Sequence, residues 1–138
     1  MTRTEMREEA FKLLYSLEIQ KENIEEQTDL YIENNKIEDK KTIEYIKDVI
    51  LGIESNKTEI VEYINRNLKQ EWTIDRISIA NLVILKLAIY EIVYKKIPYK
   101  AGIDEAVKIS KKYGEESSKV FINGILASLI KELRLEEN

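Results

Sequence analysis

The stretch ISIANLVILKLAIYEIVYKKI at residues 77–97 is the most apolar part of the chain, and it decides the fold class. Its 21 residues would suffice to cross a bilayer. However, Asn81, Lys86 and Glu91 interrupt it at five-residue steps. Each step turns a helix by about 500°, so these polar side chains fall on different sides, whereas a membrane helix tolerates them on an inward face alone. The stretch therefore predicts a central helix of a water-soluble protein, covered by neighbouring helices on most sides.

Before this segment, apolar residues at steps of three and four predict further helices. A first helix is expected over about 4–20, followed by a polar connection at 21–38 that holds a short helix near Leu30 to Glu33. Asp39 is placed to cap the next helix. The apolar stripe of that helix is expected at Ile43, Ile46, Ile50, Leu51 and Ile53. Ser55 or Asn56 then restarts the chain into a helix that reaches Leu68.

After the central segment, Pro98 is expected to end the helix, because proline lacks a backbone donor and disfavours helical geometry at the residue before it. A helix to about Tyr113 follows, with Gly114 as its C′ residue. Ser117 or Ser118 is expected to cap the last helix. The apolar stripe of that helix comprises Phe121, Ile125, Leu126, Leu129, Ile130 and Leu133. The sequence thus predicts about seven helices with short connections.

The composition also predicts an all-α chain, and its length suits one domain over residues 1–138, or two small subdomains that share a core. Hydrophobic residues make up 43% and charged residues 35%, and one Pro and four Gly are too few turn residues for a multi-strand β fold. Because the chain has no Cys and no His, thiol nucleophiles, imidazole bases and Cys/His zinc sites are excluded.

Catalysis is not predicted. The carboxylates fall at helix-surface positions without a paired set, and the four glycines stand alone at 52, 102, 114 and 124, so no phosphate-binding glycine loop is present. Residues 1–20 alternate charged and apolar residues and lack the apolar core of a signal peptide. We therefore expect a cytoplasmic protein that is not an enzyme, does not enter a membrane, and uses no cofactor and no metal.

Charge is unevenly distributed along the chain. The net charge is −4, yet residues 95–120 carry 7 basic and 4 acidic side chains. Lys108, Lys111 and Lys112 share one face of the predicted helix, and Lys119 opens the next helix. Phe121 follows two residues later, and cations with an aromatic ring in one segment suit single-stranded RNA, whose bases stack on rings. Phe121 equally fits the apolar stripe of its helix, so the pattern alone leaves core packing open.

The stretch IPYKAGIDEAVKISKKYGEESSKVFINGIL at residues 97–126 resembles the C-terminal signature of the NusB family. The matching positions are Pro98-Tyr99-Lys100, Asp104-Glu105-Ala106, Tyr113-Gly114 and Phe121-Ile122-Asn123-Gly124-Ile125-Leu126. Upstream, ILKLAIYEI at 84–92 is similar to the central-helix motif of the family, with Lys86 where Arg is usual. Near the start, Arg7-Glu8 and Leu14-Tyr15 match two further pairs.

The resemblance implies a fold of two roughly perpendicular three-helix bundles that form one RNA-binding domain. NusB-like proteins are transcription antitermination factors that bind the boxA element of ribosomal RNA leader transcripts. They act with the ribosomal protein NusE, and indirectly with other Nus factors and RNA polymerase. Carried over position by position, the RNA-binding residues become Arg3, Arg7, Tyr15, Lys119 and Phe121, with Tyr99 and Asn123 as weaker candidates. The resemblance places the NusE-facing surface near Asp75 and Asn81.

The chain departs from the family pattern at two places. The N-terminal arginine cluster is thinned to Arg3 and Arg7, and Ser117 replaces an acidic residue often found before the last helix. Each lost phosphate contact weakens RNA binding and flattens its salt dependence. We therefore expect weaker binding to RNA alone and a heavier reliance on NusE.

Two other functions stay open at this point. One is the RNA-recognition domain of a ribosomal RNA methyltransferase, which the chain end at Asn138 disfavours because no cofactor-binding domain follows. The other is a helical interaction module without RNA binding, which the net charge of −4 and the thinned arginines favour. The sequence decides neither whether the protein forms a homodimer nor which RNA sequence it prefers.

Overall fold

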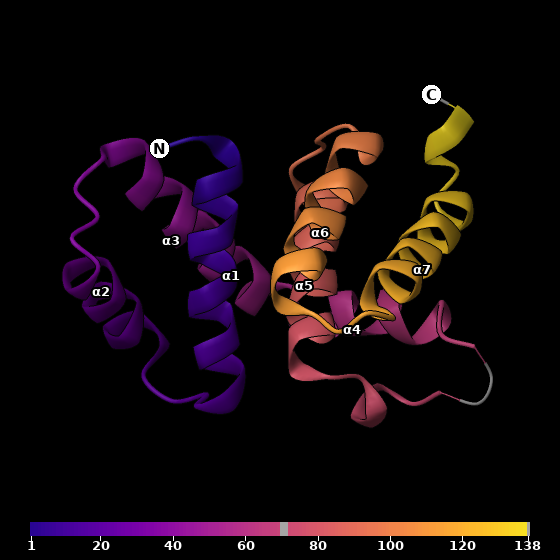
Figure 1. The fold of residues 1–138 in the computed structure, drawn as a ribbon, viewed down its shortest axis with the longest axis horizontal. Coiled ribbons are helices and arrows are strands. Elements are labelled where there is room, and N and C mark those ends of the chain that lie inside the picture. Colours follow the sequence, from indigo (N-terminus) through magenta and orange to yellow (C-terminus); the bar gives the residue numbers. More distant parts are fainter. Residues whose placement is uncertain (70–71, 138) are drawn as a thin grey trace. The chain divides into compact units, whose positions relative to one another are not determined.

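The computed structural model describes residues 1–69 and 72–137, and every regular element in this part is helical (Figure 1). The chain divides into two compact units, Met1–Ser55 and Asn56–Asn138. The all-α fold class is therefore confirmed, as is the number of helices, since the described residues form seven α-helices. By sequence, the first unit has 8 basic and 14 acidic residues, and the second has 14 and 12, so their net charges are −6 and +2.

The first unit is built from α1 (Arg3–Ile19), α2 (Ile24–Asn34) and α3 (Lys40–Ser55), and each helix contacts the other two. Asp39 caps α3 as predicted, because its Oδ2 accepts from the backbone N of Thr42 at 3.2 Å. Buried apolar side chains from α1 and α3 form most of the core: Ala10, Phe11, Leu13, Leu14, Leu17, Ile46, Val49, Ile50 and Ile53.

The prediction for residues 21–38 was wrong in extent, because α2 runs over 11 residues where a short helix near Leu30 to Glu33 was expected. Tertiary contacts explain the difference. Thr28 is buried, and the Tyr31 hydroxyl of α2 donates to Glu9 Oε1 of α1 at 2.9 Å. The apolar stripe of α3 was also misplaced at one position. Leu51 is 58% exposed, and Val49 occupies the buried place.

The second unit contains α4 (Lys57–Arg66), α5 (Ile79–Ile89), α6 (Tyr99–Tyr113) and α7 (Ser118–Glu132). Two short 3₁₀ turns complete it, η1 (Ile74–Arg76) and η3 (Leu135–Glu137). The helix α5 contacts α4, α6 and α7, and so it is the central helix that the sequence predicted. Its buried residues are Val83, Ile84, Leu85, Leu87, Ala88 and Ile89.

The central segment does not stay α-helical up to Pro98. It continues from α5 as a π-helix, η2 (Tyr90–Tyr94), in which the backbone N of Lys95 donates to the carbonyl of Tyr90. The Tyr94 hydroxyl donates to Glu59 of α4, and burial together with this hydrogen bond raises the pKa of Tyr94. Among the described residues no helix has both the length and the apolar character needed to cross a membrane.

The connection between α6 and α7 is fixed by a tight approach at Gly114. This glycine is the C-cap of α6 with φ −92°, and not the left-handed C′ residue that was predicted. A Cβ added there would lie 2.6 Å from Ser118 Oγ and 2.8 Å from the carbonyl oxygen of Ser110. Both serines are buried, so neither can move aside easily. The glycine is required here for space and not for an unusual backbone angle.

A polar cluster joins the end of α4 to the end of α7. Arg66 Nε donates to Glu132 Oε2 at 2.6 Å, and Asn67 Nδ2 donates to Glu132 Oε1 at 2.8 Å. Ser128 Oγ in turn donates to Asn67 Oδ1 at 2.6 Å. The hydrogen bond from Asn67, with a further contribution from Arg66, lowers the pKa of Glu132 below its ordinary value of 4.5. The ionised carboxylate therefore stabilises the folded unit.

We expect Gly114→Ala to lower the free energy of unfolding by about 1–3 kcal/mol, because its methyl group overpacks a site that cannot expand. Gly124→Ala is the matched control. A Cβ at Gly124 meets nothing within 4 Å, and Gly124 lies inside α7, so alanine should raise stability by about 0.5–1 kcal/mol. Urea unfolding of both variants measures the difference. Two shifts of the same sign would contradict the packing argument.

We expect Glu132→Gln to be less stable than the natural protein at neutral pH, by about 1 kcal/mol. A carboxyl whose pKa is lowered by folding contributes stability above its unfolded pKa and loses it as the pH falls through the folded pKa. The two proteins should therefore converge in stability below pH 4.5. Urea unfolding across pH 3–7 tests this, with Glu116→Gln as a control for the loss of one exposed negative charge. A constant difference across this range would refute the linkage.

Candidate nucleic-acid interface

The start of α7 carries the candidate residues of the second unit. Ser117 takes the N-cap position, but its side chain makes no cap hydrogen bond. The Ser118 hydroxyl accepts instead from the backbone N of Glu115 at 2.9 Å, so the expected serine cap is corrected to a bond within the preceding turn. The first turn of α7 holds no acidic residue. The positive end of the helix dipole therefore faces an approaching anion without an opposing carboxylate in that turn.

Lys119 and Asn123 are exposed and lie four residues apart, so they share one face of α7. A phosphate group on that face can accept from the ammonium of Lys119, while the amide of Asn123 can both donate and accept hydrogen bonds. The face is suited to contact a polynucleotide backbone and the edge of a base.

Phe121 is half-buried, and its ring pairs with a residue that sequence reasoning did not select. The ring of Trp72 lies 5.8 Å from that of Phe121, centroid to centroid, with the planes inclined by 47°. Trp72 is 45% exposed, so the pair offers an aromatic surface to solvent. The signal in the sequence was a single Trp in a polar stretch, but nothing in the pattern joined it to α7.

Helix α6, which precedes α7 in the chain, carries an exposed basic face. Lys108, Lys111 and Lys112 are exposed on one continuous helix, as predicted. Lys108 Nζ lies 3.4 Å from Glu105, and Lys112 Nζ lies 5.6 Å from the centroid of the Tyr113 ring. Tyr99, the first residue of α6, is half-buried.

In the first unit, the candidates on α1 differ in their access to solvent. Arg3 is exposed at the helix start, whereas Arg7 is 8% exposed and keeps most of its surface inside the protein. Tyr15 is 37% exposed, and its ring lies 6.1 Å from that of Phe11 at a tilt of 53°. Arg3 and Tyr15 are therefore the residues of this group that can meet a ligand directly.

The two candidates for partner binding lie before and at the start of α5. Asp75 is exposed in η1. Asn81 is half-buried, its backbone N donates to Ser78 Oγ at 3.1 Å, and its side-chain Oδ1 is buried without a hydrogen-bond partner. An unsatisfied acceptor costs about 1–3 kcal/mol. Within residues 1–69 and 72–137, no three acidic side chains gather as metal ligands.

Comparison with known proteins gives one consistent family. A model of the NusB family matches residues 4–131. The chain is 42% identical over 134 residues to the transcription antitermination protein NusB of Clostridium botulinum (strain Alaska E43 / Type E3), covering 96% of this chain and 100% of that protein. It is 41% identical to the protein of the same name from Clostridium acetobutylicum, with coverage of 94% and 96%.

Comparison with solved structures gives the same family as the sequence comparisons. NusB of T. maritima is 36% identical and superposes with a TM-score of 0.87, covering 96% of this chain and 92% of that one. A chain in the crystal structure of the antitermination factors NusB and NusE in complex with double-stranded RNA is 27% identical, with a TM-score of 0.85 and coverage of 96% and 99%. Sequence and structure agree over nearly the whole length, and the chain belongs to the NusB family.

Proposed function

We propose that this protein is a transcription antitermination factor that binds boxA-type single-stranded RNA in ribosomal RNA leader transcripts together with NusE. Its curated relatives carry the name of that activity, and a similar chain has been solved with NusE and RNA. Contacts with other Nus factors and RNA polymerase follow through the assembled complex. Both units act in this proposal as one RNA-binding domain, and the place of action is the cytoplasm, where transcription occurs in bacteria.

The observation that carries the choice of RNA is the pairing of the exposed Trp72 with the half-buried Phe121 in the first turn of α7, the turn that also carries Lys119. Bases are stacked inside a duplex, but a single strand can turn its bases onto aromatic rings. A lysine in the same turn neutralises a phosphate of the strand and contributes the salt-dependent part of the affinity. The RNA of the similar solved complex is double-stranded, so the strandedness of the preferred RNA is itself a point to measure.

The remaining candidates take supporting roles in this proposal. Arg3 and Tyr15 are accessible enough to contact RNA, while Arg7 has little surface exposed to a ligand. Tyr99 and Asn123 extend the surface of the second unit. With one accessible arginine on α1, RNA binding without NusE is expected to be weak.

We expect Phe121→Ala to weaken binding of a boxA-like single-stranded RNA by about 1–3 kcal/mol, because one base loses its stacking partner. Lys119→Ala should reduce the slope of log affinity against log salt by about 0.7, the value for one phosphate contact on a single strand. Fluorescence anisotropy across a salt series measures both effects. Val120→Ala is the matched control, since Val120 lies between them on the same turn and is 76% exposed.

If Phe121→Ala and Lys119→Ala both keep the affinity of the natural protein for RNA, the start of α7 is not the RNA-binding site. Equal affinity of the natural protein for a duplex of the same sequence would contradict the preference for single strands that the aromatic pair implies.

We expect Asp75→Lys to weaken binding to NusE by about tenfold or more while the affinity for RNA alone stays within about twofold. A reversed charge on an exposed residue opposes a complementary partner surface without disturbing the fold. Titration of NusE followed by calorimetry measures the first quantity, and anisotropy measures the second. Lys57→Glu, a charge reversal at the start of α4, is the control. Full NusE affinity in the Asp75 variant would place the partner surface elsewhere.

A further inference from the structure

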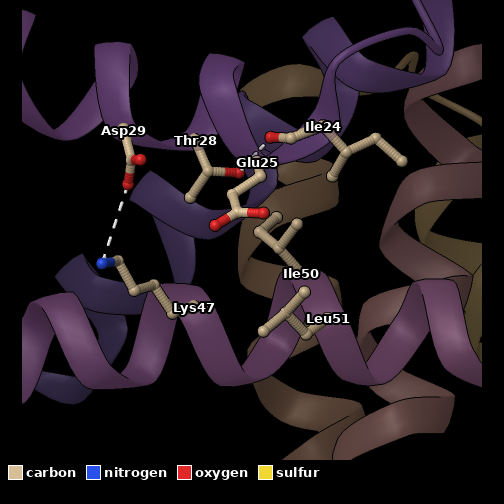
Figure 2. A pocket seen from close by; sticks show the side chains of 7 residues that line it. All are labelled: Ile24, Glu25, Thr28, Asp29, Lys47, Ile50 and Leu51. Atoms are coloured by element: carbon tan, nitrogen blue, oxygen red, sulfur yellow. Dashed lines mark hydrogen bonds and ion pairs between the residues drawn. The ribbon is translucent and has the colours of Figure 1, made fainter.

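A pocket of about 190 Å³ lies between α2 and α3 in the first unit (Figure 2). Its apolar part is formed by Ile24, Ile50 and Leu51, and its polar part includes Glu25, Asp29 and Lys47. Figure 2 shows the side chains of Ile50 and Leu51 rising from α3 toward Glu25 on α2. None of the RNA-binding candidates lines this pocket, so the proposed antitermination function leaves it unused.

The size of the pocket indicates what can fill it. Sites for small molecules and cofactors usually enclose about 300–1,000 Å³, which is larger than this pocket. The pocket instead suits one large apolar side chain. Leu51 is 58% exposed at its rim, while the neighbouring Ile50 is 3% exposed and forms its base. Interfaces between proteins commonly have this form, in which an apolar centre accepts an anchor residue and polar groups surround it.

The charge around the pocket indicates the chemistry of the partner. Helix α2 carries four carboxylates, Glu25, Glu26, Asp29 and Glu33, and no basic residue. An RNA phosphate would be repelled by this helix, whereas a cationic protein segment would be attracted. The first unit as a whole has a net charge of −6, which extends the attraction to the approach of the partner.

In the ion pair at the rim of the pocket, a cation of the partner can take the place of Lys47 opposite Asp29. Lys47 Nζ lies 3.7 Å from Asp29 Oδ1, and the two side chains are 50% and 62% exposed. Exposed pairs of this kind contribute little stability, so exchanging Lys47 for a cation of the partner has little cost. Thr28, also in the lining, already donates its hydroxyl to the carbonyl of Ile24.

We propose that the groove between α2 and α3 docks a basic amphipathic helix of a partner protein. One leucine-sized side chain of that helix fills the pocket against Ile50 and Leu51, and a Lys or Arg one turn away pairs with Glu25 or Asp29. Helices bind grooves in this way through apolar anchors at three- and four-residue spacing. None of the proposed RNA-binding residues is among those that line this pocket.

A synthetic Leu/Lys amphipathic peptide of about 15 residues, long enough for appreciable helix, is the probe. It is titrated into the ¹⁵N-labelled full chain while amide chemical shifts are followed. We expect the largest shifts at the seven residues that line the pocket, Ile24, Glu25, Thr28, Asp29, Lys47, Ile50 and Leu51. A twin peptide with Glu in place of every Lys should leave those amides unmoved. Shifts that map elsewhere, or equal binding of the acidic twin, would overturn the proposal.

Two matched pairs of variants separate the pocket from a general attraction to acidic surface. Leu51→Ala should weaken the peptide about tenfold, whereas Leu30→Ala, which removes a 48% exposed leucine of α2 outside the pocket, should not. Asp29→Lys should likewise weaken binding more than Glu33→Lys, because Glu33 does not line the pocket. Equal losses within either pair would contradict the site. Leu51→Ala should keep its affinity for RNA, so the result is independent of the antitermination proposal.

Discussion

Burial of α5 is the constraint on which the second unit depends. Its aliphatic side chains point to nearly every side of the helix, and six of its 11 residues are buried. Each large aliphatic side chain removed from water contributes about 1.5–3 kcal/mol, and a single neighbour could cover one side of the helix alone. Three helices, α4, α6 and α7, therefore pack around it. Once they do, the faces that α6 and α7 turn to solvent are determined, and the residues on those faces are the ones available for binding.

The candidate RNA surface follows from that arrangement. Helix α7 gives Ile122, Leu126 and Leu129 to the core, all at 0% exposure, and leaves Lys119 and Asn123 in water. Gly114 keeps the turn before α7 close to α6, and the exposed lysines of α6 are thereby held in the same unit as the start of α7. The polar cluster around Glu132 then joins the far end of α7 to α4. Packing and binding thus use different residues of the same helix.

The sequence predicted what hydrophobic spacing controls, namely the seven helices, the central segment and the cap at Asp39. It missed features that depend on contacts between distant residues. The polar helix α2 is held by neighbours that its own sequence does not show, and the π-helix after Ile89 changes hydrogen bonding without changing composition. The same limit applies to the site. Lys119 was predictable as a cation at a helix start, but the pairing of Trp72 with Phe121 and the burial of Arg7 arise from folding.

The two units carry unequal net charges, −6 and +2, and the net charge of −4 conceals this difference. The local charge of a surface, and not the net charge of the chain, governs the approach of a polyanion to that surface. The same difference in charge between the units governs retention of the protein on ion-exchange resins. An anion-exchange resin retains the protein through its acidic unit, while the basic side chains of the second unit attract a polyanion. The acidic isoelectric point of about 5.1 is therefore compatible with affinity for a strongly negative ligand.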